Sequence, residues 1–326
     1  MLLKVTHETT LNYTDLITET VMELRMAPRQ QDLQRRLSFS LAIGPSAGVS
    51  NYFDWLGNMV HVFSIQPPHK EVKIVASSVV ETRVEPAAAL ASSDKWPIPS
   101  REEQAFHDFL GFSNTVNDSG ALRELVMSLH ITEGTPLATV AQKMLAVIDE
   151  KFTYEKGVTT ATTPVSDVLE HARGVCQDFT HLMIAMARCL GIPACYVSGV
   201  IHSDNGHLRG GAQTHAWCEL FFPSCGWVGF DPTNKCPVNG QFVTVALGRD
   251  YRDVPPNRGL YKGKAKEVMD VKVFTQEMHE LPSNLPDERI ERLGIATYPG
   301  SAAFGRMRDG RVEEQQQQQQ QEQQQQ

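Results

Sequence analysis

Gly174-Val175-Cys176-Gln177-Asp178-Phe179 opens the segment around which this chain is organised. The apolar residues that follow recur at the spacing of one face of an α-helix: Phe179, Leu182, Met183, Met186, Ala187 and Leu190. Gly191-Ile192-Pro193 ends the pattern, because a glycine followed by a proline is typical of a helix C-terminus. Cys176 therefore falls in the first turn, where the positive end of the helix dipole favours a thiolate. We expect a nucleophilic cysteine at this position.

Two later segments carry the groups that a thiolate needs. Residues 215–222 have the pattern of a strand with His215 and Trp217 on one face, and residues 227–231 form a second strand after a short loop. Together they predict a hairpin with His215 and Asp231 near its open end. Residues directly opposite each other in an antiparallel pair point to the same face, so a four-residue loop would aim Asp231 away from His215. A Cys-His-Asp site therefore requires a three- or five-residue loop, or a bulge.

These motifs resemble the transglutaminase-like superfamily: Gly-Val-Cys-Gln-Asp-Phe at a helix start, Thr-His-Ala-Trp on a strand, and Gly-Trp-Val-Gly-Phe-Asp-Pro-Thr-Asn after it. The resemblance implies a papain-like core in which Cys176, His215 and Asp231 act together as a catalytic triad. Tyr13 and the run Glu23-Leu24-Arg25-Met26 resemble bacterial members that carry a β-rich N-terminal region. The superfamily includes cross-linking enzymes, proteases, amidases, peptide deglycosylases and members without activity.

The expected fold class is α+β, with an N-terminal antiparallel β-sandwich followed by a papain-like, transglutaminase-like core. In that core a helical layer, with the nucleophile at a helix N-terminus, packs on an antiparallel sheet. The expected helices lie near residues 120–130 and from residue 135, and a strand over residues 266–276 is expected to close the catalytic sheet. We expect four segments: a β-rich domain over 1–85, a linker over 86–100, the catalytic domain over 101–295 and a disordered, glutamine-rich tail over 296–326.

Composition limits the partners and the compartment. The net charge of −8 argues against nucleic acid or an anionic membrane as the main partner. No apolar run approaches a bilayer span, and the first residues lack the pattern of a signal peptide, so we expect a cytoplasmic protein. The 6 cysteines include no CxxC pair, so we expect neither a structural zinc site nor another metal or cofactor. The sequence leaves the oligomeric state open.

The predicted function is that of a cysteine-dependent acyl-transfer enzyme acting on peptide or protein amides through a thioester intermediate. Hydrolysis by a protease or amidase is favoured over amine transfer, because the sequence has no calcium loop of the EF-hand type that would suit a calcium-switched cross-linker. Two alternatives within enzyme chemistry stay open, a cross-linking transglutaminase and a peptide deglycosylase. A third is a non-catalytic interaction domain that retains the fold.

Three residues are candidates for substrate binding: Trp217, Tyr154 and His207. Trp217 shares the predicted face of His215, and Tyr154 precedes the loop over residues 155–164. His207 lies with Arg209 in the glycine-rich loop that leads into the His215 strand, so either side chain is placed to contact substrate. The alternatives are a packing role for the two aromatic residues and a solvated turn for the loop.

Overall fold

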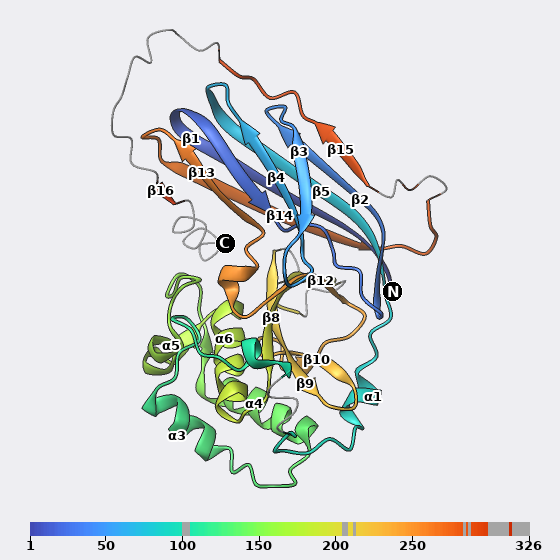
Figure 1. Cartoon of the computed structure of the whole chain (residues 1–326), viewed down its shortest axis with the longest axis vertical. Helices are drawn as coiled ribbons and strands as arrows, with labels where there is room; N and C mark the ends of the chain where they lie inside the picture. The colour runs from blue at the N-terminus through green and yellow to red at the C-terminus, as the bar shows by residue number, and fades with distance from the viewer. Residues whose placement is uncertain are drawn as a thin grey trace. The chain divides into compact units, whose positions relative to one another are not determined.

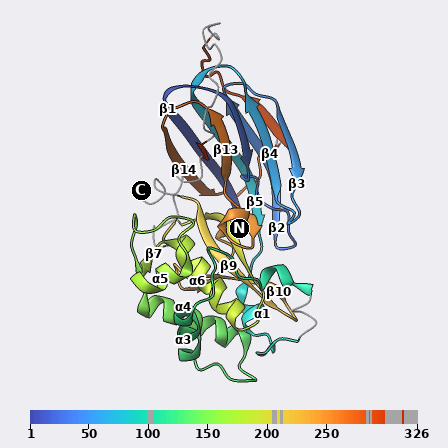
Figure 2. The same cartoon turned by 60° about the vertical axis from the view of Figure 1, so that its left-hand side comes forward.

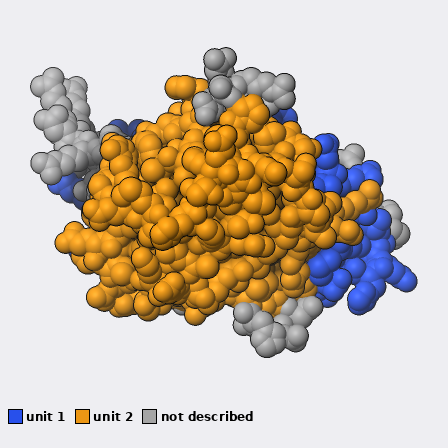
Figure 3. Space-filling view, turned by 90° about the horizontal axis from the view of Figure 1, so that it is seen from below, with its two compact units in different colours: residues 1–82, 255–326 blue, residues 83–254 orange. Residues whose placement is uncertain are grey.

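The computed structural model describes residues 1–99, 105–203, 208–210, 213–282, 285, 288–298 and 313–314. These residues form two compact units, shown in Figures 1 and 3. Unit 1 combines residues 1–82 with the described residues from 255 onward, and unit 2 consists of residues 83–254. In the part of the chain that the structure describes, we find no helix with the length and apolarity needed to cross a membrane.

Unit 1 is built around one long strand, β1 (Leu2–Leu24). Its first half pairs antiparallel with β5 (His69–Thr82) and β14 (Glu267–Glu277), and its second half with β4 (Met59–Ile65) and β13 (Asn257–Lys262). Shifts of register between residues 12 and 17 and between residues 18 and 21 separate the two halves, as β-bulges do. One strand therefore belongs to both layers of a sandwich.

The other strands extend these two layers, which Figure 2 shows from a second side. They are β2 (Gln34–Gly44) beside β5, β15 (Arg289–Arg292) beside β2, β3 (Val49–Phe53) beside β4, and β16 (Glu313–Glu314) beside β13. Leu41 and Ile74 from one layer share a single apolar core with Phe63 and Tyr261 from the other. The β-rich N-terminal region of the expected fold class is confirmed, and strands after residue 255 complete it.

The strand expected over residues 266–276 forms as β14, but its place in the fold was predicted wrongly. It pairs with β1 in unit 1 and does not close the catalytic sheet. Periodicity identifies a strand and its buried face, yet it does not specify the partner, and β1 supplies an unpaired edge here. Residues 255–295, expected in the catalytic domain, accordingly fold with the N-terminal strands.

The segment expected as a linker is part of unit 2. Residues Pro86–Leu90 form the short helix α1, and the indole Nε1 of Trp96 donates a hydrogen bond of 2.7 Å to the carbonyl oxygen of Leu190. The expected tail falls largely on residues 299–312 and 315–326, which lie outside the described residues.

Unit 2 contains a five-stranded antiparallel sheet in the order β11-β10-β9-β8-β12. Its strands are β8 (Ala194–Ile201), β9 (His215–Phe222), β10 (Gly226–Asp231), β11 (Cys236–Pro237) and β12 (Phe242–Gly248). The helices are α3 (Gly120–Ser128), α4 (Leu137–Lys151), α5 (Val165–His171) and α6 (Cys176–Cys189), with short helical turns η1 (His107–Phe109) and η2 (Tyr251–Asp253). Together the two units confirm the expected α+β class.

Helix α6 lies between the sheet and the other helices. It contacts β8 and β9 on one side, and α3, α4 and α5 on the other. Every residue from Asp178 to Arg188 is buried, so the one-faced apolar stripe expected from the sequence underestimates the burial. The polar residues between the apolar positions are covered by neighbouring elements and must therefore find partners inside the protein.

Two of these polar residues connect α6 to the turn that follows β12. Arg188 donates hydrogen bonds to the carbonyl oxygens of Gly111 at 2.7 Å, Ala194 at 2.9 Å and Arg249 at 2.6 Å. The Nε2 atom of His181 accepts the backbone N–H of Tyr251 at 3.2 Å. Burial lowers the pKa of His181 to about 4, so the neutral ring required of an acceptor is the form present at neutral pH.

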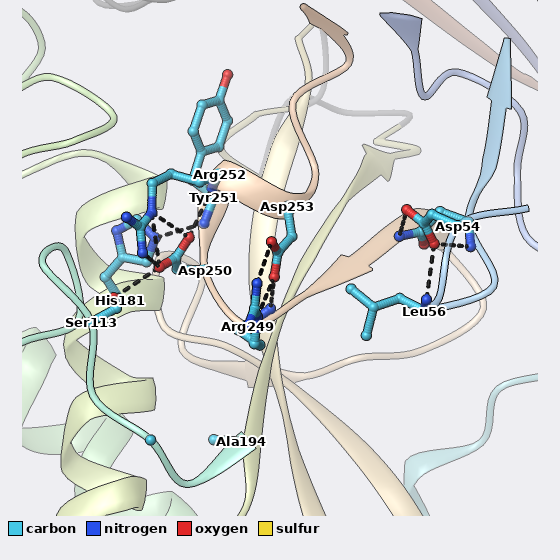
Figure 4. A network of polar contacts seen from close by, with 12 residues as sticks. Asp54, Leu56, Ser113, His181, Ala194, Arg249, Asp250, Tyr251, Arg252 and Asp253 are labelled. Atoms are coloured by element: carbon cyan, nitrogen blue, oxygen red, sulfur yellow. Dashed lines mark hydrogen bonds and ion pairs between the residues drawn. The ribbon is translucent and has the colours of Figure 1, made fainter. Parts of the chain in front are cut away.

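The same turn carries a buried carboxylate, shown in Figure 4. Asp250 accepts hydrogen bonds from the hydroxyl of Ser113 and from the guanidinium of Arg252, each at 2.8 Å. A second pair, Arg249 with Asp253, lies on the more exposed side of the turn. These contacts fix the segment that brings Tyr251 into the core of unit 2.

We expect Asp250→Asn to destabilise unit 2. Burial alone would raise the pKa of Asp250, but the hydrogen bonds from Arg252 and Ser113 outweigh it and lower the pKa to about 2. Because the folded pKa is lowered, this stabilisation is present above the ordinary pKa of 3.8 and is lost as the pH falls toward 2. Urea denaturation at pH 7 should show a loss of about 2 kcal/mol in the free energy of unfolding.

Arg249→Gln is the matched control, because it removes an ion pair from the same turn at a position where the arginine side chain is 45% exposed. We expect a change below about 1 kcal/mol. Equal stability of Asp250→Asn and the control at pH 7 would contradict the assigned role of the buried carboxylate.

Candidate active site

The hairpin of β9 and β10 has the register that a Cys-His-Asp site requires. Gly226 pairs with Phe222 and Phe230 pairs with Cys218, which leaves residues 223–225 as a three-residue loop. The prediction of an odd loop is therefore confirmed. Continued by one residue, this register sets Asp231 opposite Trp217, on the face that carries His215.

Asp231 and His215 form a buried ion pair. Nε2 of His215 donates to Oδ2 of Asp231 at 2.9 Å, and the two residues are 2% and 0% exposed respectively. Oδ1 of Asp231 accepts the backbone N–H groups of Thr233 at 2.8 Å and Asn234 at 3.2 Å, and Oδ2 accepts the side-chain amide of Asn234 at 2.7 Å. The carboxylate is therefore held from both sides, and it fixes the orientation of the imidazole.

The second ring nitrogen of His215 is left for Cys176. Burial lowers the pKa of His215, but the charge and hydrogen bond of Asp231, with a smaller contribution from the Cys176 side chain, outweigh it and raise the pKa to about 10. Nδ1 has no hydrogen-bond partner of good geometry among the described residues, so its interaction with the thiol is a loose one. An imidazolium at neutral pH next to a thiol favours the thiolate.

The start of α6 is held by Asp178, two residues after the thiol. Its Oδ2 accepts the backbone N–H of Val175 at 2.7 Å and the hydroxyl of Thr159 at 2.6 Å. Burial raises the pKa of Asp178 to about 6 although these hydrogen bonds oppose the rise, so the carboxylate is ionised at neutral pH. A Cβ at position 174 would stand 2.7 Å from this carboxylate, which explains the glycine two residues before Cys176. The turn that carries Cys176 is thereby rigid.

Two tyrosines lie near the thiol. Tyr154 in β6 (Thr153–Tyr154) pairs with Gly174 in the parallel strand β7 (Arg173–Gly174), and its ring centroid is 6.2 Å from that of Phe179. Burial raises the pKa of Tyr154 and of Tyr251, and the charge of Cys176 raises both further. Both hydroxyls are therefore neutral and can donate hydrogen bonds, as a substrate-binding role of Tyr154 would require.

The other two candidates for substrate binding have different outcomes. Trp217 is 0% exposed, and its ring packs edge-to-face on Phe242 at 5.2 Å, within a cluster that includes Val197. A side chain with no accessible surface does not contact substrate, so this expectation is corrected: the indole supports the strand beneath His215. His207 lies outside the described residues.

Three residues of the site were missed by the sequence analysis: Asn234, Thr159 and Tyr251. The run Asp-Pro-Thr-Asn over 231–234 carried a signal for Asn234, because aspartate before proline favours a turn in which its side chain accepts backbone N–H groups. Thr159 and Tyr251 reach the site from distant parts of the chain, and their local sequence gives no indication of that position.

The remaining cysteines have other environments. Cys195 and Cys218 are buried, and burial raises the pKa of each well above its ordinary value. Burial and the charge of Asp231 raise the pKa of Cys236 to about 12. Among the described residues, no three His, Cys, Asp or Glu side chains are grouped as a metal site needs. Cys176 is thus the thiol that faces an imidazole.

Comparison with known proteins identifies the family of this chain. The family model of the transglutaminase-like superfamily matches residues 125–232, and the model of the bacterial transglutaminase-like N-terminal region matches residues 3–81. An uncharacterized protein of Mycobacterium tuberculosis is 33% identical over 286 residues, which are 83% of this chain and 91% of that protein. A protein-glutamine gamma-glutamyltransferase of Pseudomonas aeruginosa is 32% identical over 153 residues, which are 43% of this chain and 23% of that protein.

A solved structure shares the fold across both units. It is that of a candidate cysteine protease from Cytophaga hutchinsonii, which superposes with a TM-score of 0.68 at 22% identity and covers 86% of this chain and 93% of that one. With matches to both the core and the N-terminal region, the chain belongs to the transglutaminase-like superfamily.

Proposed function

We propose that this protein is a cysteine-dependent enzyme that hydrolyses amide bonds of peptides or proteins through a thioester intermediate. Cys176 is the nucleophile, His215 the acid and base, and Asp231 the group that orients the imidazole. The observation that supports this most strongly is the buried His215–Asp231 pair, which commits one ring nitrogen to the carboxylate and leaves the other for the thiol.

In the first half of the reaction, the Cys176 thiolate attacks the amide carbonyl carbon. The carbon–nitrogen bond breaks as Nδ1–H of His215 gives its proton to the leaving amine, and a thioester remains on the sulfur. In the second half, the neutral imidazole takes a proton from water and the resulting hydroxide attacks the thioester carbon. The carbon–sulfur bond then breaks, the carboxylic acid leaves, and the Cys176 thiolate and the His215 imidazolium are restored. Asp231 stabilises the imidazolium at each stage without taking its proton.

The developing oxyanion is placed at the start of α6. The first N–H groups of a helix have no acceptor within it, and Asp178 takes the N–H of Val175, which leaves the N–H of Cys176 for the oxyanion. The hydroxyl of Tyr154 is our candidate for the second donor, because it is neutral and its strand pairs with Gly174, two residues before Cys176. An N–H donor of this kind typically contributes about 3 kcal/mol to transition-state stabilisation.

Amine transfer is the second candidate reaction. It is favoured by the similarity to a glutamyltransferase, which extends over 43% of this chain. The two reactions share every step up to the thioester and differ in whether water or an amine attacks it. A peptide library incubated with the protein and a labelled primary amine, read by mass spectrometry, separates them. Free acids indicate hydrolysis and labelled amides indicate transfer, whereas a protein that yields neither is the non-catalytic interaction domain.

Cys176→Ala should abolish turnover in this assay, by about a thousandfold or more, while the melting temperature stays within a few degrees of wild type. The loss follows because alanine has no nucleophile, and the fold survives because the side chain is only half-buried at the first position of a helix. Cys225→Ala is the control, since this exposed thiol lies in the hairpin loop and its removal should leave turnover unchanged. Full activity of Cys176→Ala would end the proposal.

Asp231→Asn should shift the pH dependence of thiol alkylation. Without the carboxylate, burial is opposed only by the smaller contribution of Cys176, so we expect the pKa of His215 to fall well below about 10. We expect a larger fraction of the ring to be neutral, so that the thiolate of Cys176 loses its counter-ion and alkylation by iodoacetamide at pH 6 slows by about tenfold or more.

The reaction is followed site by site with mass spectrometry from pH 4 to 10. Cys225 serves as the internal control in each sample, and its profile should be the same in both proteins. Identical midpoints for Cys176 in wild type and Asp231→Asn would show that the thiol and the imidazole form no ion pair.

A further inference from the structure

Residues 208–210 are tied to the site through one side chain. Oδ1 of Asn234 accepts the backbone N–H of Arg209 at 2.8 Å, and Nδ2 of Asn234 donates to the carbonyl oxygen of Arg209 at 3.1 Å. The same Nδ2 donates to Oδ2 of Asp231 at 2.7 Å. Both hydrogens of this amide are therefore used, and the backbone of an exposed arginine is fixed to the carboxylate that orients His215.

The next residue lies directly against the imidazole. Gly210 has a φ of +92°, and a Cβ at this position would stand 2.5 Å from Nδ1 of His215. A side chain there would clash with the ring and would be strained, so only glycine fits. Nδ1 is the ring nitrogen left for the thiol of Cys176. Arg209 therefore directly precedes a residue, Gly210, that lies against the imidazole on its thiol side.

The guanidinium of Arg209 is held over the ring of Tyr154, with Cζ 4.9 Å from the ring centroid. Tyr154 pairs with Gly174, two residues before Cys176, so the stacked pair stands beside the nucleophile. Stacking occupies the flat face of the guanidinium and leaves its N–H edge open, which is the edge that binds a carboxylate in bidentate fashion. No carboxylate among the described residues forms an ion pair with this arginine.

From these contacts we propose that Arg209 is a specificity residue that binds a carboxylate carried by the acyl donor, next to the amide that Cys176 attacks. The inference rests on the proposed function and names the class of substrate: an amide whose acyl part is anionic. The carboxylate comes either from an acidic side chain or from a free C-terminus, since both present the same group to the guanidinium. Arg209 takes no part in the transfer of protons or of the acyl group.

The first test uses two alkylating agents that differ in charge. Iodoacetate carries a carboxylate and iodoacetamide a neutral amide, and both react with the thiolate of Cys176. The ratio of their rate constants, measured site by site in wild type and in Arg209→Gln, reports the attraction of an anion to this position. We expect the ratio to fall about five- to tenfold in Arg209→Gln, because a full positive charge beside the thiol is removed.

Arg173→Gln is the matched control. It removes the same charge from β7, but the side chain of Arg173 is 47% exposed and points to Glu155 at 3.2 Å, so solvent screens the change and we expect the ratio to stay within about twofold of wild type. His215 attracts iodoacetate equally in all three proteins and cancels in the comparison. An unchanged ratio in Arg209→Gln, or an equal fall in both variants, would overturn the proposal.

The alkylation ratio distinguishes a failure of the role of Arg209 from a failure of the proposed function. If Cys176 has no enhanced reactivity, the ratio is still obtained at pH 9, where an ordinary thiol is largely ionised, and only the enzymatic role fails. If the protein turns over peptides but the ratio is unchanged, only the role of Arg209 fails.

The second test identifies the source of the carboxylate. Peptides turned over by the wild type are remade with Gln for Glu, Asn for Asp, or an amidated C-terminus, and the kcat and KM of each are measured with both proteins. We expect Arg209→Gln to raise KM about tenfold for the carboxylate forms and to leave the neutral forms unchanged. Sensitivity to one of these replacements names the source, whereas equal effects on charged and neutral peptides contradict carboxylate binding.

Discussion

A pair of opposite charges without access to water, His215 and Asp231, is the constraint on which the active-site side of unit 2 depends. Moving such ions out of water costs several kcal/mol each, so the pair is tolerated only where its remaining hydrogen-bonding capacity is filled. Here the carboxylate accepts bonds from Thr233, from both the backbone and the side chain of Asn234, and from the ring itself. The turn after β10 supplies the donors that hold the carboxylate, and the three-residue hairpin loop sets the register that brings the carboxylate to His215. Both are thus needed to stabilise the imidazolium.

A second buried carboxylate acts on the other partner. Asp178 fixes the turn that presents Cys176, and its own burial is compensated by Thr159 and by the N–H of Val175. The thiol and the imidazole are therefore positioned by two separate networks, one at the start of α6 and one at the end of β10. Each of these networks can be weakened without removing a reacting atom.

The sequence was sufficient to predict those elements for which the local pattern and the motif spacing agree. It was insufficient to predict contacts between residues that are far apart in the chain. The start of α6, the hairpin and the parity of its loop were all predictable from residues 174–234, because side-chain direction alternates along a strand. The complete burial of α6 was not, since polar residues such as His181 and Arg188 conceal it in the sequence. The assignment of β14 failed for the related reason that alternation does not name a neighbouring strand. Asn234 was within reach of sequence reasoning, whereas Tyr251 became visible only through its packing in three dimensions.

The way in which β1 pairs has a consequence for the order of events during protein synthesis. Its partners β13 and β14 are encoded after all of unit 2, so β1 waits for residues beyond 255 before its two layers are complete. Unit 2 is continuous in sequence and has no such wait. Because domains fold as units once their residues are available, unit 2 can form before β13 and β14 exist, while one edge of β1 stays unpaired in the meantime. The open edge of β1 is thus a place at which the nascent chain can pair with another chain and aggregate.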